Sequence, residues 1–410
     1  MTVEVRTCPP DRFAEMLTTA EIAFSEDVPD ELIERVRKVS DPERFVCGLD
    51  GDRFVATGGV FGVRLSVPGG ELPAGGVTWI TVVPSHRRRG ILRSMMRLMV
   101  DDCHAREEPL AMLWASQAPI YQRFGFGLAT LAVSLEAETA LSGFARKWPA
   151  EGSCRLLRAG EGLDLVTPVY EAARAQRSGF LARTPDWWVG QLPRVDKDAR
   201  GGEVRRLVVY ETDAGPEAYA VYKTRIDWGV QGGDGTATVA EAIGCTERGT
   251  REIWRFLLDM DLMRTLKTDR LPADHPILLL ASEPRRLGMR FGDGLWLRLV
   301  DVRTALEGRT YGIDGHASDR VALELRDDYC PWNAGRWLVE VEDGRAQVTA
   351  TTVEADLALD ANDLGSLFLG GFTASALART GRIVELRAGG LAAADRLFPT
   401  ALQPWCPQEF

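Results

Sequence analysis

The chain has 410 residues, a length typical of two or three domains. Its 45% of hydrophobic and 26% of charged residues are ordinary for globular proteins and exclude wholesale disorder. The 49 lysines and arginines against 59 aspartates and glutamates give a net charge of −10. That charge argues against a sequence-independent binder of nucleic acid or of anionic membranes, and it favours a cationic ligand.

Several classes of site lack their usual sequence evidence. The seven cysteines are scattered singly and the four histidines have no zinc-binding spacing, so we expect neither a disulfide framework nor a metal. GxSxG, Walker and GxGxxG motifs are absent, which removes the usual evidence for a hydrolase, an NTPase or a dinucleotide-binding enzyme. No export signal and no run of about 18 apolar residues occurs, so we expect a cytoplasmic protein.

The first part of the chain alternates between helical and extended patterns. Apolar spacing predicts two short helices within residues 12–39, and a meander of three or four strands follows within residues 44–83. Residues 86–106 carry an apolar stripe of helical period, and a strand is predicted at 110–116.

The region 205–300 repeats this order of elements. We predict three strands, then a helix at 249–266 and a strand at 277–282. The segment WASQAPIYQRFGFG (114–127) also resembles LASEPRRLGMRFGDG (280–294), which lies at the corresponding place in the second half. We interpret this similarity as the sign of a duplicated domain.

Beyond residue 300 the pattern changes to that of a small α+β domain of strands, a hairpin and short helices. The chain is therefore predicted to contain three domains, at residues 1–140, 141–300 and 301–410. The fold class is α+β, with mixed central sheets flanked by helices.

One constellation indicates chemistry. The strand WITVV is followed by the turn PSHRRRG and by a strong amphipathic helix. The first amides of a helix have no intrahelical partner and the helix dipole is positive there, so this turn can bind an anion, most naturally a pyrophosphate. Gly90 lets backbone approach the phosphate oxygens, and the three preceding arginines add positive charge.

The run Arg87-Arg88-Arg89-Gly90-Ile91-Leu92 resembles the pyrophosphate loop of GCN5-related N-acetyltransferases (GNAT), although Leu92 stands where glycine or alanine is common. Together with the duplicated segment and a terminal domain similar to sterol carrier proteins, nearly the whole chain resembles the Eis (enhanced intracellular survival) family of bacterial acetyltransferases. The resemblance implies tandem GNAT domains and a sterol-carrier-protein-like third domain.

The resemblance also implies acetyl-CoA as the acetyl donor. The strand backbone of Ile80, Thr81 and Val82 would hold the pantetheine. The pyrophosphate would be held by the loop residues Arg88, Arg89, Gly90, Ile91, Leu92 and Arg93. Ser116 and Gln117 would lie beside the thioester.

Two catalytic groups are implied by the same resemblance. Tyr121 would act as general acid toward the departing CoA thiolate, since a phenol of pKa near 10 is protonated at neutral pH. The terminal carboxylate of Phe410 would act as general base. We expect the acceptor to contact Trp79 and the acidic residues Glu26, Asp27 and Glu409. The central copy reads GCTERGT at its loop position and is interpreted as having lost its cofactor site.

We therefore expect an N-acetyltransferase that acts on primary amines of aminoglycosides, polyamines or lysine side chains through a ternary complex, without nucleic-acid or membrane partners. Family resemblance further implies a homo-oligomer, a hexamer. Two alternatives stay open, namely an N-acyltransferase of the myristoyl type that uses longer acyl-CoA donors, and a non-enzymatic regulator that binds acyl-CoA or lipid.

Overall fold

The computed structural model describes residues 3–24, 27–149, 151–157, 161–191, 205–229 and 232–410. The fold divides into two compact units. The first contains residues 1–130, 295–404 and 408–410, and the second contains residues 131–294 and 405–407. Glu26, one of the residues expected to contact the acceptor, lies outside the described residues.

The first unit is built on a seven-stranded sheet of order β1-β2-β3-β4-β5-β14-β6. The strands are β1 (Glu4–Thr7), β2 (Phe45–Asp50), β3 (Arg53–Val67), β4 (Gly70–Val82), β5 (Leu110–Trp114), β6 (Gly127–Leu128) and β14 (Leu295–Leu299). Most neighbours are antiparallel, but β4 and β5 run parallel, so the chain must cross over between them. This crossover contains the predicted arginine-rich turn.

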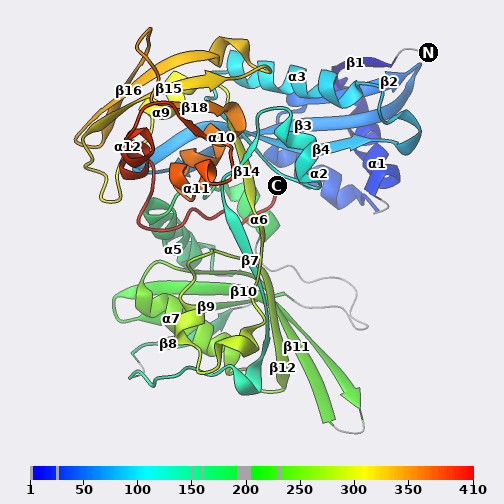
Figure 1. The fold of residues 1–410 in the computed structure, drawn as a ribbon. Coiled ribbons are helices and arrows are strands. Elements are labelled where there is room, and N and C mark those ends of the chain that lie inside the picture. Colours follow the sequence, from blue (N-terminus) through cyan, green and yellow to red (C-terminus); the bar gives the residue numbers. More distant parts are fainter. Residues whose placement is uncertain (1–2, 25–26, 150, 158–160, 192–204, 230–231) are drawn as a thin grey trace. The chain divides into compact units, whose positions relative to one another are not determined.

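Helices cover both faces of this sheet (Figure 1). The predicted helices within residues 12–39 are α1 (Phe13–Phe24) and α2 (Asp30–Val39), and the amphipathic segment forms α3 (Ile91–Ala105). A Cβ built on Gly58 would meet Met95 of α3, whereas one on the next residue, Gly59, would meet Phe45, whose ring contacts Phe13 of α1. Because successive strand residues point to opposite faces, α1 and α3 pack on opposite sides.

An irregularity in β4 opens the sheet toward the crossover. Thr57 of β3 pairs with Thr81, but Gly59 pairs with Thr78, so β4 holds one extra residue there. Trp79, within this bulge, has a φ of 54°, a left-handed conformation that is costly for a tryptophan. The parallel pairing with β5 ends at Gly76, so the two strands diverge beyond this point.

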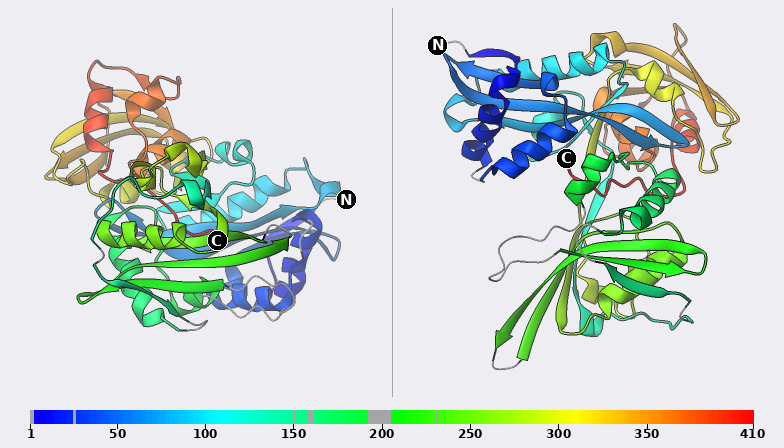
Figure 2. Two further views of the ribbon diagram at one scale, coloured as in Figure 1. Left: turned by 90° about the horizontal axis from the view of Figure 1, so that it is seen from below. Right: turned by 180° about the vertical axis from the view of Figure 1, so that it is seen from behind.

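The terminal domain belongs to the first unit and has a five-stranded sheet of order β17-β16-β15-β18-β19. Its helices pack together beside the sheet, as the orange and red segments in Figure 2 show. The elements are α9 (Val302–Glu307), β15 (Asp319–Arg326), β16 (Gly335–Glu342), β17 (Arg345–Ala350), β18 (Leu357–Asp360), α10 (Ala361–Phe368), α11 (Ala374–Ala378), β19 (Val384–Glu385) and α12 (Gly390–Leu397).

The second unit has its own seven-stranded sheet, of order β13-β7-β12-β11-β10-β9-β8. Its strands are β7 (Leu131–Glu138), β8 (Ser153–Leu157), β9 (Arg205–Thr212), β10 (Gly215–Gly229), β11 (Gly232–Gly244), β12 (Met263–Leu271) and β13 (Arg290–Asp293). Its helices are α5 (Leu163–Gln176), α6 (Pro185–Gln191), α7 (Glu247–Leu258) and α8 (Ile277–Leu280). The sheet again contains one parallel pair, β11 with β12, joined through α7.

Two predictions for this unit were wrong. The helix expected at 249–266 ends at Leu258, and its last residues belong to β12, whose Leu266 is buried in the core. The strand expected at 277–282 is instead the short helix α8, with Ile277 buried. In both segments a short apolar run fits either period. Pairing with β11 makes the end of the first segment a strand, whereas the second segment forms a helix that buries Ile277.

Within the described residues, no helix is long and apolar enough to cross a membrane. The same residues contain no group of three or more histidine, cysteine or acidic side chains that could hold a metal ion.

Candidate active site

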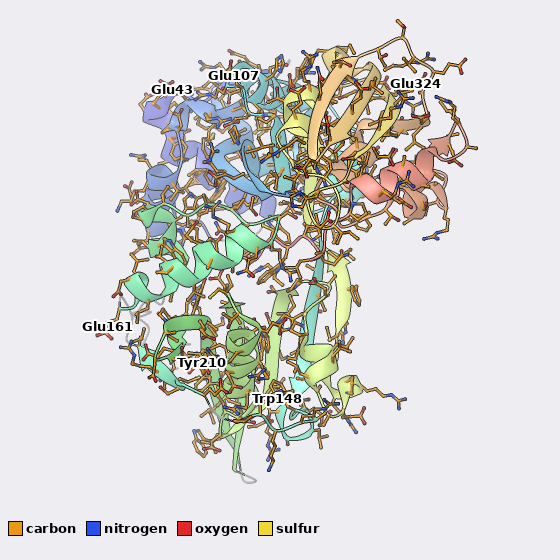
Figure 3. The ribbon with its side chains drawn as sticks, turned by 90° about the vertical axis from the view of Figure 1, so that its left-hand side faces the viewer. Glu43, Glu107, Trp148, Glu161, Tyr210 and Glu324 are labelled. Atoms are coloured by element: carbon orange, nitrogen blue, oxygen red, sulfur yellow. The ribbon has the colours of Figure 1, made fainter. Side chains whose placement is uncertain are left out.

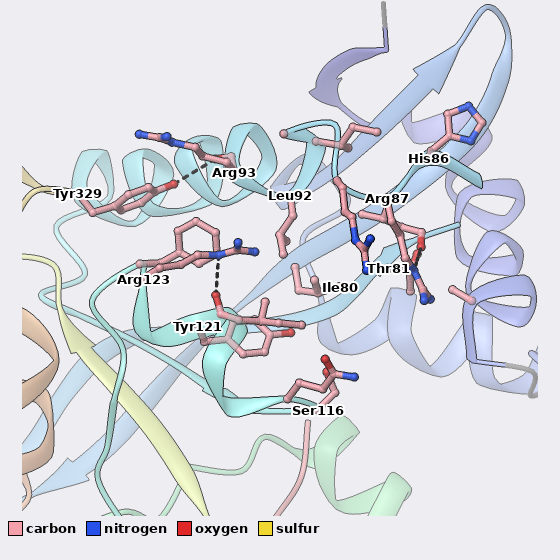
Figure 4. A pocket seen from close by; sticks show the side chains of 18 of the residues that line it. Ile80, Thr81, His86, Arg87, Leu92, Arg93, Ser116, Tyr121, Arg123 and Tyr329 are labelled. Carbon is pink, nitrogen blue, oxygen red and sulfur yellow. Dashed lines mark hydrogen bonds between the residues drawn. The ribbon is translucent and has the colours of Figure 1, made fainter. Parts of the chain in front are cut away.

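A cavity of about 1070 Å³ lies in the first unit, between the bulged end of β4, the start of α3 and the segment after β5 (Figure 4). Tyr121 and Ser116 form one side of it, and Arg87 and Arg93 lie on the crossover side. This volume is slightly above the usual range of small-molecule and cofactor sites, which is about 300 to 1000 Å³.

The start of α3 is built to receive an anion. Gly90 precedes the helix with a φ of 82°, and no side chain of the described residues caps the first amides. Apart from its chain neighbours, no described residue has an atom within 4 Å of where a Cβ of Gly90 would stand, so the approach to these amides is open on that side. The residues from Gly90 to Arg93 line the cavity. Uncapped amides, the positive helix end and an open approach together fit a pyrophosphate.

Positive side chains surround the same helix start. Arg87, Arg88, Arg93 and Arg123 line the cavity, while Asp328 is the one carboxylate among the described lining residues. Among the described residues, neither Arg88 nor Arg93 has an ion-pair partner, so both remain available to a ligand. The local charge is thus positive in a chain that is acidic as a whole.

Arg89 differs from the other loop arginines. It does not line the cavity, and its guanidinium donates to the backbone oxygen of Ser85 at 3.0 Å. The arginine run is therefore divided, because Arg88 faces the cavity whereas Arg89 braces the turn. The expectation that the Arg89 side chain would hold the cofactor is not supported by its position.

The β4 wall consists of Ile80, Thr81 and Val82, as predicted for the pantetheine. The Thr81 hydroxyl lies 2.7 Å from the hydroxyl of Thr57, and that second hydroxyl also bonds the backbone oxygen of Trp79. These bonds fix the bulge from the β3 side. Apolar side chains and the strand backbone are therefore what β4 presents to the cavity.

Tyr121 lies in α4 (Ala118–Gln122), directly after Ser116 and Gln117, and all three residues line the cavity. The Tyr121 side chain is only 4% exposed, and its ring meets Phe126 edge to face. Burial raises the pKa of Tyr121 above its ordinary value, and a hydrogen bond with Ser116 partly opposes this effect. The phenol is therefore protonated at neutral pH and can donate a proton into the cavity.

The chain end is docked within the first unit. The Trp114 indole donates to the backbone oxygen of Gln408, and a Cβ built on Gly76 would stand 3.0 Å from the Phe410 ring. Phe410 thus lies against β4 where β4 and β5 diverge. It is not among the described residues that line the cavity.

The structure brings none of the three described acceptor residues, Asp27, Trp79 and Glu409, into the cavity. Asp27 is exposed between α1 and α2, Glu409 is exposed, and Trp79 lies in the β4 bulge. None of these three lines the cavity. Ala23, near the end of α1, does line it, so this part of the chain borders the cavity through an apolar residue.

Sequence reasoning missed four polar lining residues, namely His86, Arg123, Asp328 and Tyr329. His86 and Arg123 directly flank recognised motifs, so proximity could have signalled them. Asp328 and Tyr329 come from the terminal domain, more than 200 residues from α3 in sequence, and no local pattern marks them.

The corresponding helix start in the second unit is closed. The hydroxyl of Thr246 caps α7 by accepting from the amide of Gly249 at 2.8 Å. The Glu217 carboxylate, 7% exposed, accepts from the Thr246 hydroxyl and is paired with Arg248. The hydrogen bond with Arg248 lowers the pKa of Glu217, so this carboxylate is ionised. The central helix start is thus occupied by the protein's own polar groups.

Comparisons with known families agree with this architecture. Models of an acetyltransferase (GNAT) domain match residues 4–129 and 179–299, and a sterol carrier protein domain matches residues 302–407. The predicted tandem GNAT domains and sterol-carrier-like domain are confirmed.

Individual relatives cover most of the chain. An uncharacterized N-acetyltransferase of Streptomyces avermitilis is 37% identical over 377 residues, with 91% of this chain and 90% of that protein covered. The N-acetyltransferase Eis of Mycobacterium tuberculosis is 34% identical over 328 residues, with 78% and 77% covered. The crystal structure of Eis1 from Mycobacterium abscessus has a TM-score of 0.83 at 28% identity, covering 99% of this chain and 100% of that chain.

Proposed function

Because the chain belongs to the Eis family of GCN5-related N-acetyltransferases, we propose that it transfers acetyl from acetyl-CoA to a primary amine of a cationic acceptor. Aminoglycosides, polyamines and lysine side chains are acceptors of this class. One observation carries the proposal, namely that a single cavity holds the uncapped start of α3 and the buried phenol of Tyr121.

Different groups of the chain would bind the pyrophosphate and the pantetheine arm of the donor. The amides from Gly90 to Arg93 and the free guanidinium groups of Arg88 and Arg93 bind the pyrophosphate. Strand β4 offers backbone at its bulge to the pantetheine arm, which directs the thioester toward Ser116 and Tyr121. This order places the reactive end of the donor beside the group that is to donate a proton.

Tyr121 then serves the leaving group. As the amine nitrogen bonds to the acetyl carbon and the carbon–sulfur bond breaks, Tyr121 gives its proton to the departing thiolate. A raised pKa keeps this proton in place before the reaction. No cysteine lines the cavity among the described residues, which favours direct transfer over an acetyl-cysteine intermediate.

We further propose that the Phe410 carboxylate removes the proton from the acceptor ammonium. The docking of Phe410 over Gly76 and the anchoring of Gln408 by Trp114 support this role, because both contacts lie at the diverging ends of β4 and β5. A negative charge there also attracts a cationic acceptor.

A screen of amine acceptors with acetyl-CoA, read as release of free thiol, tests the proposal. Release that depends on the amine supports acetyl transfer. Preference for long-chain acyl donors would instead favour the N-acyltransferase alternative, and binding without any thiol release would favour an acyl-CoA or lipid-binding regulator. The proposed hexamer is tested separately by the mass of the assembly in solution.

A further inference from the structure

The terminal domain supplies part of the cavity wall. Asp328 and Tyr329, in the loop after β15, line the cavity together with Arg93 and Arg123 of the first domain. In Figure 4, Tyr329 and Arg123 lie on the side of the cavity away from His86. This wall is distinct from the Ser116 and Tyr121 side proposed for the thioester.

A buried ion pair fixes the loop that carries these two residues. Asp327 accepts from the amides of Tyr329 and Cys330 through one carboxylate oxygen, at 3.1 and 2.8 Å. Its other oxygen accepts from Arg298 of β14 at 2.5 Å, and Arg298 is fully buried. Arg298 also donates to the backbone oxygen of Phe124, which itself lines the cavity. The loop is therefore held rigidly to the GNAT domain.

The Tyr329 ring is held in one orientation. Its hydroxyl donates to the backbone oxygen of Arg93 at 3.2 Å, and the guanidinium of Arg97 lies 4.6 Å from the ring centroid. Phe124 meets the ring edge to face at 5.2 Å. Burial raises the pKa of Tyr329 to about 12, so its hydroxyl stays a donor at any working pH. A fixed aromatic ring at a cavity wall is a surface for stacking.

We propose that Tyr329 and Asp328 form the adenine subsite of the acyl-CoA donor. The inference rests on the proposed function, because it follows from the direction of the donor. With the pyrophosphate at the start of α3 and the thioester at Tyr121, two sides of the cavity are left for the nucleoside, one at His86 and one at the terminal-domain loop. Of the two, the side at the loop offers an aromatic ring, that of Tyr329, beside Arg93 and Arg123.

The side chains of the terminal-domain loop, Asp328 and Tyr329, suit an adenine base better than a phosphate. A purine base stacks on an aromatic ring, and its exocyclic amino group donates hydrogen bonds that the exposed Asp328 carboxylate can accept. A phosphate would be repelled by Asp328 and is instead suited to Arg93 and Arg123. The terminal domain thus completes donor recognition.

The test compares two donors, acetyl-CoA and S-acetyl-4′-phosphopantetheine, which lacks the 3′-phospho-AMP portion and so keeps one phosphate of the pyrophosphate but has no adenine. Tyr329→Leu should raise KM for acetyl-CoA roughly tenfold with kcat nearly unchanged, as expected for lost base stacking. The same variant should leave KM for the shorter donor at the wild-type value. Tyr329→Phe keeps the ring and should restore most of the affinity.

Two further variants separate recognition from structure. Asp328 is exposed, so Asp328→Ala should fold normally, and it should weaken acetyl-CoA alone, by about threefold to tenfold. Glu324→Gln, on β15 of the same domain (Figure 3), is a matched control that should change neither donor. Equal losses with both donors in Tyr329→Leu and Asp328→Ala would overturn the inference in favour of a purely structural role.

Titration calorimetry with CoA and with 4′-phosphopantetheine, without an acceptor, measures the two binding affinities and tests the subsite without enzymatic turnover. If Tyr329→Leu weakens the binding of CoA but not that of 4′-phosphopantetheine, the adenine subsite is supported. This result would support the subsite even if no amine is acetylated and the proposed reaction fails. Equal binding of CoA by wild type and both variants overturns the subsite while leaving the reaction intact. Absence of CoA binding to the wild type overturns both.

Discussion

The indole Nε1 of Trp114 donates a hydrogen bond to the backbone oxygen of Gln408, at 3.0 Å. Trp114 ends β5, the strand that diverges from β4, and Gln408 is two residues from the chain end. This contact holds the last residues of the chain against the sheet of the first unit, so the proposed role of the Phe410 carboxylate can be tested at the chain end.

Residues appended after Phe410 should lower kcat by roughly 10²-fold, because they turn the carboxylate into an amide and remove the base. Phe410→Leu should retain substantial activity, since the carboxylate survives. Acetyl-CoA affinity should stay near wild type in both. Full activity of the extended protein at saturating acceptor would show that the base lies elsewhere.

Tyr121→Phe should lower kcat by about 10²- to 10⁴-fold with little change in KM for acetyl-CoA, because the transition state loses its proton donor. Tyr170→Phe is a suitable control, since that hydroxyl donates to Leu181 outside the cavity. The raised pKa of Tyr121 also predicts that its deprotonation does not reduce kcat below about pH 10. Near-normal turnover of Tyr121→Phe would remove this residue from the mechanism.

Arg88→Ala and Arg89→Ala form a matched pair in one loop. Arg88 faces the cavity, so its loss should weaken acetyl-CoA binding about tenfold and reduce the salt dependence of binding. Arg89 bonds Ser85 outside the cavity, so its loss should change the Kd by less than about threefold. Titration calorimetry measures both, and equal losses would contradict the division of the arginine run.

Titration calorimetry should also find one acetyl-CoA per chain. The first unit has an open helix start, whereas that of α7 is capped by Thr246. A stoichiometry of two would require a second donor site and would refute the interpretation of the central domain as a degenerate copy.

Stability should fall in mild acid because of His275. This side chain is buried, and its Nδ1 accepts from the amide of Ile277, so the ring is neutral. Burial lowers the pKa of His275 to about 3 from an ordinary 6.5. The unfolded chain therefore binds more protons between these values, so this stabilisation is complete above pH 6.5 and is lost as the pH falls toward 3.

The loss attributable to His275 amounts to about 5 kcal/mol at most, reached only when the pH falls below 3. Free energies of unfolding between pH 7.5 and 4.5 test it against His275→Gln, which cannot titrate. The variant should show a smaller slope with pH. Parallel curves for the two proteins would mean that His275 does not control acid stability.

Local periodicity predicted the elements that carry most of the site. The apolar stripe from Ile91 to Cys103 predicted α3, and the arginine-rich turn before it indicated the candidate anion site without any knowledge of packing. Tyr121 is different, because its proposed role came from family resemblance and the structure adds its burial and its place in the cavity.

What the sequence could not reveal depends on contacts between distant segments. Leu266 lies in a stretch that reads as helix, and pairing of β12 with β11 makes it a strand. Tyr329 reaches the backbone of Arg93 across 236 positions of sequence. Arg88 lines the cavity whereas Arg89 bonds the backbone oxygen of Ser85. This difference depends on the geometry of the turn, which cannot be predicted from a run of identical residues.

The closed start of α7 bears on the interpretation that the central domain has lost its cofactor site. A pyrophosphate entering there would have to displace the Glu217 carboxylate, which is ion-paired with Arg248 and hydrogen-bonded to Thr246. The Thr246 hydroxyl, held by Glu217, therefore competes with such a ligand for the amide of Gly249 from within the same chain. The central domain can keep its sheet and helix without a cofactor, because a side chain of its own satisfies this amide at the helix start.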